Sequence, residues 1–276
     1  MADQPSGVAP GGGRIAGRLS RAVHKASSKP YSHSMSKRGN KKTGKGRRAR
    51  GHFDLGRWFR RWVLRAISVV FLIAVFVTVM GTFINPPTTA YMFAEGRRLA
   101  GVKYDWISID NVAPVMARSV VAAEDANFCG HWGFDLVAIR AAIDAGSNRG
   151  ASTISQQTVK NLYLWHGRSW TRKALEAFMT PLVEAIWTKR RIVEVYLNIA
   201  EFDEGVFGVK AAAQHYFGVV PADLSATQAA RLAAILPSPK TRSASKPGEY
   251  VRKRSRQIRS GAATIRADGR DDCFES

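Results

Sequence analysis

Cysteine is scarce in this chain of 276 residues, since only Cys129 and Cys273 occur. Their spacing matches none of the cysteine patterns that bind metals or form redox-active pairs. The sequence does not show whether the two side chains meet, and the missing motif favours two unpaired thiols. Spacing typical of metal ligands is absent as well, so we expect no metal site built from protein ligands.

Acidic residues are few: 21 Asp and Glu stand against 42 Lys and Arg, a formal net charge of +21. Such an excess suggests a nucleic-acid-binding protein until it is divided along the chain. Residues 1–65 hold 17 basic and two acidic residues, and residues 240–276 hold ten and five. Residues 66–239 are almost balanced, with 15 and 14. The excess belongs mostly to the two ends, and we expect no nucleic-acid partner.

Bulky apolar residues are rare in residues 1–62, which are rich in Gly, Ser, Lys and Arg. A segment of this composition cannot bury enough apolar surface to order itself. We therefore expect residues 1–62 to form a basic, disordered tail.

Charge is absent from residues 66–84, AISVVFLIAVFVTVMGTFI, which are long enough to span about 30 Å of hydrocarbon. Tryptophan and arginine are frequent just before this uncharged run, as at a cytoplasmic membrane surface: Arg57, Trp58, Arg60, Arg61, Trp62 and Arg65. A cleaved signal peptide is the alternative, but the preceding region is far longer than a normal n-region and no A-x-A site follows. We expect an uncleaved single-pass anchor over residues 63–84, with the N-terminus in the cytoplasm.

Alternating β-branched runs and internal repeats are absent after the anchor, and the pattern is helical. The expected helices cover residues 112–123, 136–145, 171–189, 191–200, 209–217 and 225–236. Asp135 is a plausible N-cap, Ser225 and Gln228 have capping-box spacing, and Pro181 should kink its helix. Pro237 and Pro239 precede a Ser-, Lys- and Arg-rich stretch. The sequence thus predicts a mostly α domain over residues 85–240 and a basic C-terminal tail over 241–276.

Polar residues without an apolar stripe fill residues 150–161, GASTISQQTVKN. On a helix Thr153, Gln157 and Lys160 would share one face. Upstream, in EDANFCGHWGFD, Glu124 and Asp125 adjoin aromatic residues that can raise a carboxyl pKa by desolvation. Carboxylates alone near a sugar would suggest a glycosidase. Added cations favour a phosphate or diphosphate leaving group, for which one base suffices.

Five ordered motifs resemble those of the family 51 glycosyltransferases, the peptidoglycan glycosyltransferases, and within them the monofunctional biosynthetic branch. They are EDANFCGHWGFD, GASTISQQTVKN, RSWTRKALEAFMTPLVE, KRRIVEVYLNIAEF and GVFGVKAAAQHYFG, beginning at residues 124, 150, 168, 189 and 205. The resemblance implies a lysozyme-like helical domain that polymerises lipid II by inversion and releases undecaprenyl diphosphate. It also implies the bacterial inner membrane, with the catalytic domain in the periplasm.

The resemblance also assigns residues. Glu124 matches the general base, which takes the proton of the acceptor's 4-hydroxyl, and Glu176 matches a second carboxylate with a supporting role in binding or orientation. Matching substrate-binding positions are Asp125, Phe128, His131, Thr153, Gln157, Lys160, Asn161, Arg168, Arg172 and Lys173. Similar enzymes hold no tightly bound cofactor but are helped by a divalent cation, Mg²⁺ or Mn²⁺. Arg191 stands where some relatives have Glu, and Ala151 where glycine is usual.

Other classes remain open at this point. A lysozyme-like muramidase or lytic transglycosylase would cut the same polymer, and a non-catalytic envelope scaffold would bind partners or lipid. The expected partners are lipid II, the growing glycan strand and the membrane, together with cell-wall synthases or division proteins. We also expect the apolar side chains Trp165, Phe178 and Trp187 to dip towards the lipid.

Overall fold

The computed structural model describes residues 55–144, 146, 152–167 and 169–275. The chain divides into two units, residues 1–52 and 53–276, and only the second is described here. Most of the predicted basic tail, Ala151 and Arg168 therefore lie outside the described residues.

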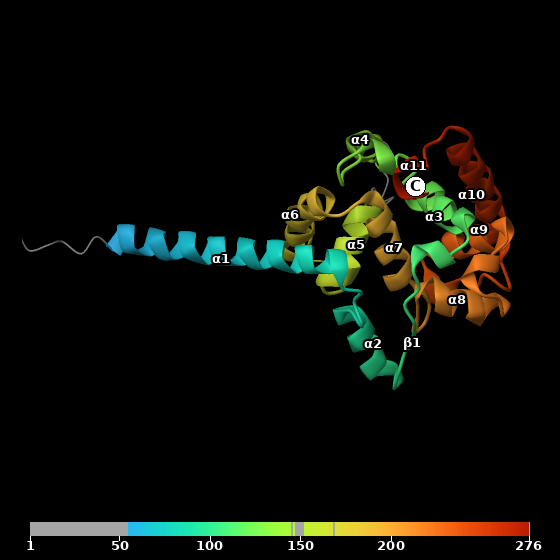
Figure 1. Ribbon diagram of the computed structural model, residues 1–276, viewed down its shortest axis with the longest axis horizontal. Coiled ribbons are helices and arrows are strands. Elements are labelled where there is room, and N and C mark those ends of the chain that lie inside the picture. Colours follow the sequence, from blue (N-terminus) through green and yellow to red (C-terminus); the bar gives the residue numbers. More distant parts are fainter. Residues whose placement is uncertain (1–54, 145, 147–151, 168, 276) are drawn as a thin grey trace, which may run out of the picture. The chain divides into compact units, whose positions relative to one another are not determined.

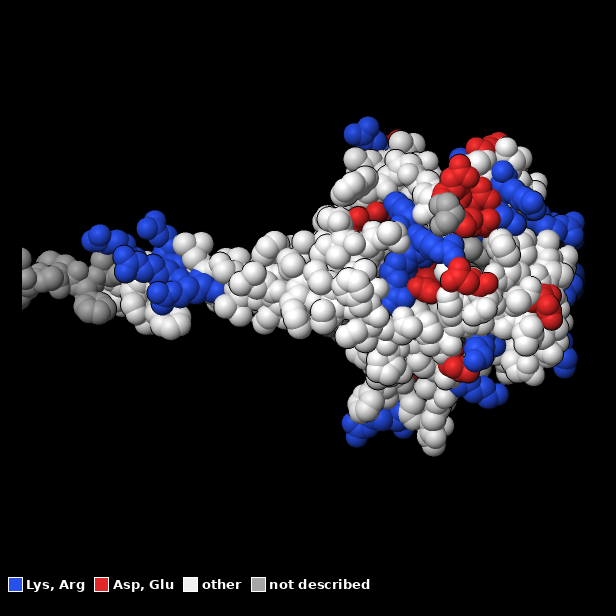
Figure 2. Space-filling view, in the orientation of Figure 1, with Lys and Arg blue, Asp and Glu red and all other residues white. Residues whose placement is uncertain are grey.

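Helix α1, Leu55–Phe83, is apolar and long enough to cross a membrane, and it is the only such helix in the described part of the chain. It begins inside the predicted tail, so the helix is longer than the expected anchor. Figure 2 shows basic side chains at its start and an uncharged surface after them. The basic residues there are Arg57, Arg60, Arg61 and Arg65.

The last turns of α1 are attached to the globular part. The indole nitrogen of Trp187 donates to the carbonyl oxygen of Thr78 at 2.7 Å, and Arg191 Nε donates to that of Gly81 at 3.2 Å. Trp187 is only 4% exposed, so the expectation that it dips into lipid is wrong: its ring packs inside the protein. Trp165 and Phe178 are exposed, as that expectation requires.

The remainder is mostly helical, as predicted (Figure 1). The other α-helices are α2 Ala90–Leu99, α3 Pro114–Glu124, α4 Leu136–Asp144, α5 Ile154–Tyr163, α6 Trp170–Ile186, α7 Lys189–Ile199, α8 Gly208–Phe217, α9 Ala226–Ile235, α10 Glu249–Ala267 and α11 Asp272–Glu275. Short 3-10 turns are η1 Ile109–Asn111, η2 Phe128–Gly130, η3 Pro221–Asp223 and η4 Pro239–Thr241. A small sheet joins β1 Lys103–Tyr104 in parallel to β3 Val206–Phe207, which pairs antiparallel with β2 Glu201–Asp203.

Local signals placed most helix ends correctly. The Asp135 carboxylate accepts from the backbone N–H of Ala138 at 2.9 Å, and Ser225 and Gln228 form the expected capping box. The helix expected over 171–189 ends at Ile186 instead, because Thr188 caps the start of α7. Pro181 lies inside α6.

Helix α3 lies at the centre of the core. It is buried continuously from Met116 to Val121, because α9 and α10 both pack against it. A helix covered on several sides needs small and apolar residues all round, which explains the sequence PVMARSVVAAE. This packing holds Glu124 at the C-terminal end of a rigid element.

Two predictions about the C-terminal part are wrong. Residues 241–276 are no tail: α10 packs on α3 and α9 through a stripe that includes Val251, Ile258 and Ile265. Cys129 and Cys273 are not free thiols but form a disulfide, with Cα atoms 5.9 Å apart. The chain returns to the loop after α3 only in three dimensions, so spacing along the sequence could not show the pair.

Candidate active site

Glu124 ends α3 and is half-buried. Its Oε2 accepts a hydrogen bond of 2.9 Å from Gln157 Nε2 on α5. Burial raises the pKa of Glu124, while the Gln157 hydrogen bond and the charges of Arg254 and Lys160 lower it and Asp125 raises it. A carboxylate with a raised pKa in a polar cleft suits a general base.

Gln157 is held in one orientation. Its Oε1 accepts from the hydroxyl of Tyr196 at 3.3 Å, which leaves the amide N–H groups for Glu124. Tyr196 is fully buried on α7, and burial raises its pKa well above the ordinary value, so the hydroxyl stays a donor. Tyr196 therefore packs in the core and also orients the side chain that contacts the carboxylate.

Lys160 lies one turn after Gln157 on the same helix, as the spacing predicts. Burial lowers the pKa of Lys160, and the nearby charges of Glu176 and Glu124 oppose that shift. The side chains of Lys160 and Asn161 form no hydrogen bond or ion pair with any residue in the described ranges. Both side chains are free to bind a ligand.

Two cavities meet at these side chains. The larger, about 680 Å³, is lined by Glu124, Gln157 and Lys160. The second, about 420 Å³, is lined by Gln157, Lys160 and Asn161 together with residues of α7 and η4. The structure thus brings the predicted base, amide and cation to one open cleft large enough for sugar and diphosphate groups.

Helix α10 forms the far wall of the larger cavity, a contribution that the sequence interpretation missed. It supplies Tyr250, Lys253, Arg254 and Gln257. The buried positions of α10 recur at helical spacing, and this signal could have revealed the helix, but its many basic residues resembled a solvated tail. Lys253 and Arg254 are therefore two cations that line the cavity of Glu124 and that the sequence did not predict there.

Four of the residues predicted to bind substrate are buried, although Asp125 and Thr153 also line a smaller cavity beside Glu124, of about 360 Å³. Phe128 is 1% exposed, and Asp125, His131 and Thr153 are buried as well. Asp125 accepts from the backbone N–H of Ile154 at 3.0 Å and hydrogen-bonds His131 Nε2 at 2.8 Å. These contacts attach the loop after α3 to the start of α5.

Thr153 is the N-cap of α5 rather than part of its exposed face. Its hydroxyl donates to the carbonyl oxygen of Gly133 at 2.7 Å and accepts from the backbone N–H of Gln156 at 3.2 Å. The predicted common face therefore holds for Gln157 and Lys160 only. The capping box, with Gln156 as the reciprocal partner, explains the polar start of this motif.

Glu176, the second carboxylate predicted for catalysis, is 2% exposed on α6. Arg172 Nη1 donates to its Oε2 at 2.7 Å, and Lys173 is paired with its Oε1. Because cations engage both oxygens, this geometry fits the supporting role, in which Glu176 fixes two cations near Lys160. The Arg172–Glu176 ion pair lies mostly in the protein interior, since both side chains are largely buried.

Arg191, which stands where some relatives have Glu, is paired with Glu194 at 2.6 Å. It also donates to the carbonyl oxygens of Gly81 and Ile84 at the end of α1. It therefore links the apolar helix to α7 and adds no carboxylate to the cleft.

One group in the described ranges has several possible metal ligands close together. Ligand atoms of Asp125, His131 and Asp135 lie within 4.8 Å of one another. However, both Asp125 oxygens bind protein groups, and Asp135 caps α4. The mixture of imidazole and committed carboxylates does not fit Mg²⁺, which requires octahedral oxygen ligands. This cluster is therefore not suited to hold Mg²⁺ for catalysis.

Comparison with known proteins agrees with this geometry. The transglycosylase family model matches residues 93–262, which include both walls of the cleft. The chain therefore belongs to the transglycosylase family, a class of enzymes that transfer glycosyl groups.

Similar proteins carry one specific name. A biosynthetic peptidoglycan transglycosylase of Jannaschia sp. (strain CCS1) is 58% identical over 220 residues, covering 80% of this chain and 92% of the relative. Proteins of the same name from Caulobacter vibrioides and Pasteurella multocida are 44% and 42% identical, over 79% and 75% of this chain and 99% and 88% of theirs.

Proposed function

We propose that this transglycosylase polymerises lipid II into β-1,4 glycan strands of peptidoglycan and releases undecaprenyl diphosphate. The observation that carries the proposal is the cleft that the Glu124 carboxylate, with its raised pKa, shares with basic residues of α10 and with Lys160, whose side chain has no partner among the described residues. The names of the relatives support peptidoglycan as the polymer.

In the proposed reaction Glu124 takes the proton from the 4-hydroxyl of the acceptor sugar. That oxygen forms a bond to C1 of the donor sugar while the bond from C1 to the diphosphate oxygen breaks. The electron pair leaves with the lipid-linked diphosphate, whose growing charge Lys160, Lys253 and Arg254 stabilise. Attack opposite the leaving group inverts the configuration at C1.

A divalent cation would act on the substrate in this scheme. Mg²⁺ or Mn²⁺ carried by the diphosphate would reduce its charge in the cleft, without protein ligands of its own. The residues of the chain then orient the diphosphate through their ammonium and guanidinium groups.

The cations also weigh against the alternatives. A muramidase or lytic transglycosylase needs a carboxylic acid to protonate a sugar leaving group, and that reaction gives Lys160 and the basic residues of α10 no anionic leaving group to stabilise. A non-catalytic scaffold would not require Gln157 to be oriented by Tyr196 towards that carboxylate. Polymerisation of lipid II is the function that uses all of these contacts.

We further propose that α1 anchors the enzyme in the inner membrane with its N-terminus in the cytoplasm and the catalytic domain in the periplasm. Basic residues flank the start of α1, as on cytoplasmic sides of membranes. The disulfide lies after α1, and disulfides persist in oxidising compartments such as the periplasm. Reporter fusions after residue 54 and after residue 275 test this topology: a C-terminal reporter active in the cytoplasm would contradict it.

The assay for the activity is incubation of the purified full chain with labelled lipid II in vesicles, followed by separation of the glycan by length. We expect lengthening strands from the parent and none from Glu124→Gln. Arg256→Ala is the matched control, because Arg256 is exposed on α10 and does not line the cavity. Degradation of finished glycan without polymerisation would instead support the lytic class. Binding of synthases or division proteins stays a prediction.

A further inference from the structure

The seven residues Gly269–Glu275, which we call the C-terminal clasp, follow α10 and lie beyond the region matched by the family model, which ends at residue 262. They nevertheless pack against the loop directly after Glu124, residues 125–130. Most of that loop is exposed, and its only buried side chains are Asp125 and Phe128. A short exposed loop beside a catalytic carboxylate needs other contacts to hold its position.

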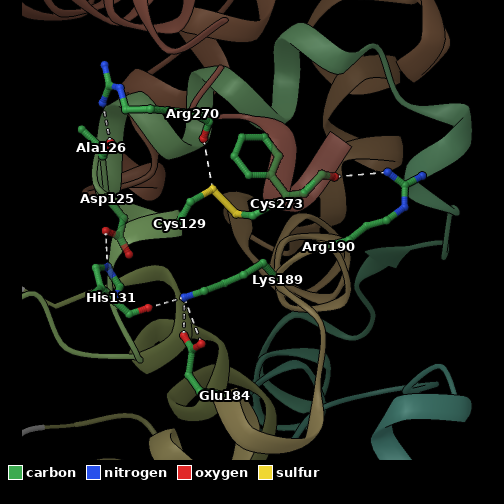
Figure 3. Close-up of a disulfide and its surroundings, with 10 residues drawn as sticks. Asp125, Ala126, Cys129, His131, Glu184, Lys189, Arg190, Arg270 and Cys273 are labelled. Carbon is green, nitrogen blue, oxygen red and sulfur yellow. Dashed lines mark hydrogen bonds and ion pairs between the residues drawn. A yellow bond between two sulfur atoms is a disulfide. The ribbon is translucent and has the colours of Figure 1, made fainter. Parts of the chain in front are cut away.

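The disulfide joins the clasp to this loop covalently (Figure 3). Cys129 belongs to η2, five residues after Glu124, and Cys273 belongs to α11. The sulfur of Cys129 also lies 3.1 Å from the carbonyl oxygen of Arg270. In the figure Asp125, Cys129 and Arg270 lie around the same loop.

Two arginines hold the backbone on either side of Glu124. Arg270 Nη1 in the clasp donates to the carbonyl oxygen of Ala126 at 2.9 Å, and Arg254 Nη2 on α10 donates to that of Ala123 at 2.9 Å. The carbonyls at the end of a helix have no partner within the helix and carry partial negative charge, so guanidinium groups stabilise them. The end of α3 is thus bound from both directions.

A third contact attaches the clasp to α3 itself. Arg118 Nη1 is paired with Asp271 at 3.2 Å and with Glu275 at 2.5 Å, and Arg118 and Asp271 are buried. Phe274 is fully buried, with its ring 6.2 Å from that of Phe128. The clasp therefore contacts both the helix that carries Glu124 and the loop that follows it.

We propose that the C-terminal clasp, closed by the Cys129–Cys273 disulfide, positions Glu124 for proton transfer, so that the enzyme is fully active only in its oxidised form. Cys129, Cys273 and Arg270 are positioning residues in this scheme, since none of them lines either of the two cavities of the cleft. The inference rests on the proposed role of Glu124 as general base. A general base displaced by about 1 Å loses on the order of 100-fold in rate, even where substrate binding is intact.

The test compares the full-length enzyme before and after reduction by a phosphine, which converts the disulfide to two thiols while water supplies the oxygen of the phosphine oxide. Steady-state kcat and KM for labelled lipid II are measured in vesicles, with thiol content read by mass spectrometry. We expect reduction to lower kcat on the order of 10- to 100-fold with KM unchanged, and reoxidation to restore it. Cys129→Ser/Cys273→Ser, given the same reductant, should show the low kcat from the start and no response.

A loss of fold is distinguished by a parallel measurement. Thermal unfolding of the reduced enzyme shows whether it stays folded at the assay temperature, and hydrogen exchange of residues 125–131 should become faster while α9 stays protected. Arg270→Ala, with the disulfide intact, should lower kcat in the same direction, whereas the exposed-arginine variant Arg256→Ala should not.

Full reduction of a folded enzyme with unchanged kcat would overturn the inference, and so would a kcat that falls only in proportion to the unfolded fraction. An oxidised parent that does not polymerise lipid II contradicts the proposed function instead. Hydrogen exchange of residues 125–131 then tests, independently of activity, whether the disulfide holds this loop in place. Equal protection of the loop in both redox states would contradict the inference.

Discussion

Helices α5 and α10 both line the larger cavity, and both are polar. Their sequences nevertheless led to opposite predictions, a helix of the binding site for α5 and a solvated tail for α10. Helix α5 carries a recognisable motif, and on a helix its Thr153, Gln157 and Lys160 were expected to share a ligand-binding face. Helix α10 carries five arginines and one lysine without a motif, and it was interpreted as a tail. In the structure α10 is the longer of the two and packs on α3 and α9.

The packing of α10 shows that the net polarity of a segment does not decide whether the segment belongs to a core. The free energy of packing comes from a minority of positions at helical spacing, such as Val251, Ile258 and Ile265. The other positions of α10 are then free to carry charge towards the cleft. The four predictions below test whether α10 is equivalent to α5 as a wall of the active site.

The largest effect is expected at the carboxylate between the two walls. Glu124→Gln keeps the shape and the contact with Gln157 but removes the base, so kcat for lipid II should fall about 1000-fold or more. The thermal midpoint should change little. If the variant keeps turnover within about tenfold of the parent, another group accepts the proton, and Glu124 is not the general base of the cleft.

The second prediction asks whether α10 is part of the core. Ile258 is 1% exposed, and Ile258→Ala should lower the free energy of unfolding by about 2–5 kcal/mol. The exposed neighbour variant Arg256→Ala should change it by less than about 0.5 kcal/mol. Denaturant titration of the full chain in detergent measures both, and equal small effects would mean that α10 does not pack as described.

The third prediction compares one cation from each wall. Lys160→Ala on α5 should lower kcat/KM on the order of 100-fold, because water screens the charge of a half-buried ammonium only partly. Lys253→Ala on α10 should lower it about tenfold, because that side chain is exposed and water screens its charge. A larger loss from Lys253→Ala would reverse the ranking and make α10 the main binding site of the diphosphate.

The smallest effect is a shift in pH dependence. Glu124 acts as a base only when deprotonated, and burial raises its pKa, so kcat/KM should fall as the pH drops through a value above the ordinary 4.5. Arg254 lowers the pKa of Glu124, and therefore Arg254→Ala should move this acidic limb to higher pH. Rates measured across a pH series test the direction, and a shift to lower pH would contradict it.

Local sequence was enough to predict the elements whose signals are short. The uncharged run predicted an apolar spanning helix, and the 3.6-residue period predicted most helices to within a few residues. Gln157 and Lys160 were correctly expected on one helical face, since one turn of helix sets that relation. The boundary between α6 and α7 was predicted at residue 190 but lies at Trp187 and Thr188, because the Thr188 side chain caps the start of α7.

Only the tertiary structure decided which side chains surround the base and which serve as supports. Asp125, His131 and Thr153 carry polar groups typical of a binding site, but in the structure Asp125 binds His131 and the backbone of α5, and Thr153 caps α5. The disulfide and the α10 wall depend on contacts between residues more than 100 positions apart, such as Cys129 with Cys273 and Arg254 with Ala123. Such contacts depend on how the helices pack together, and no local pattern along the chain encodes them.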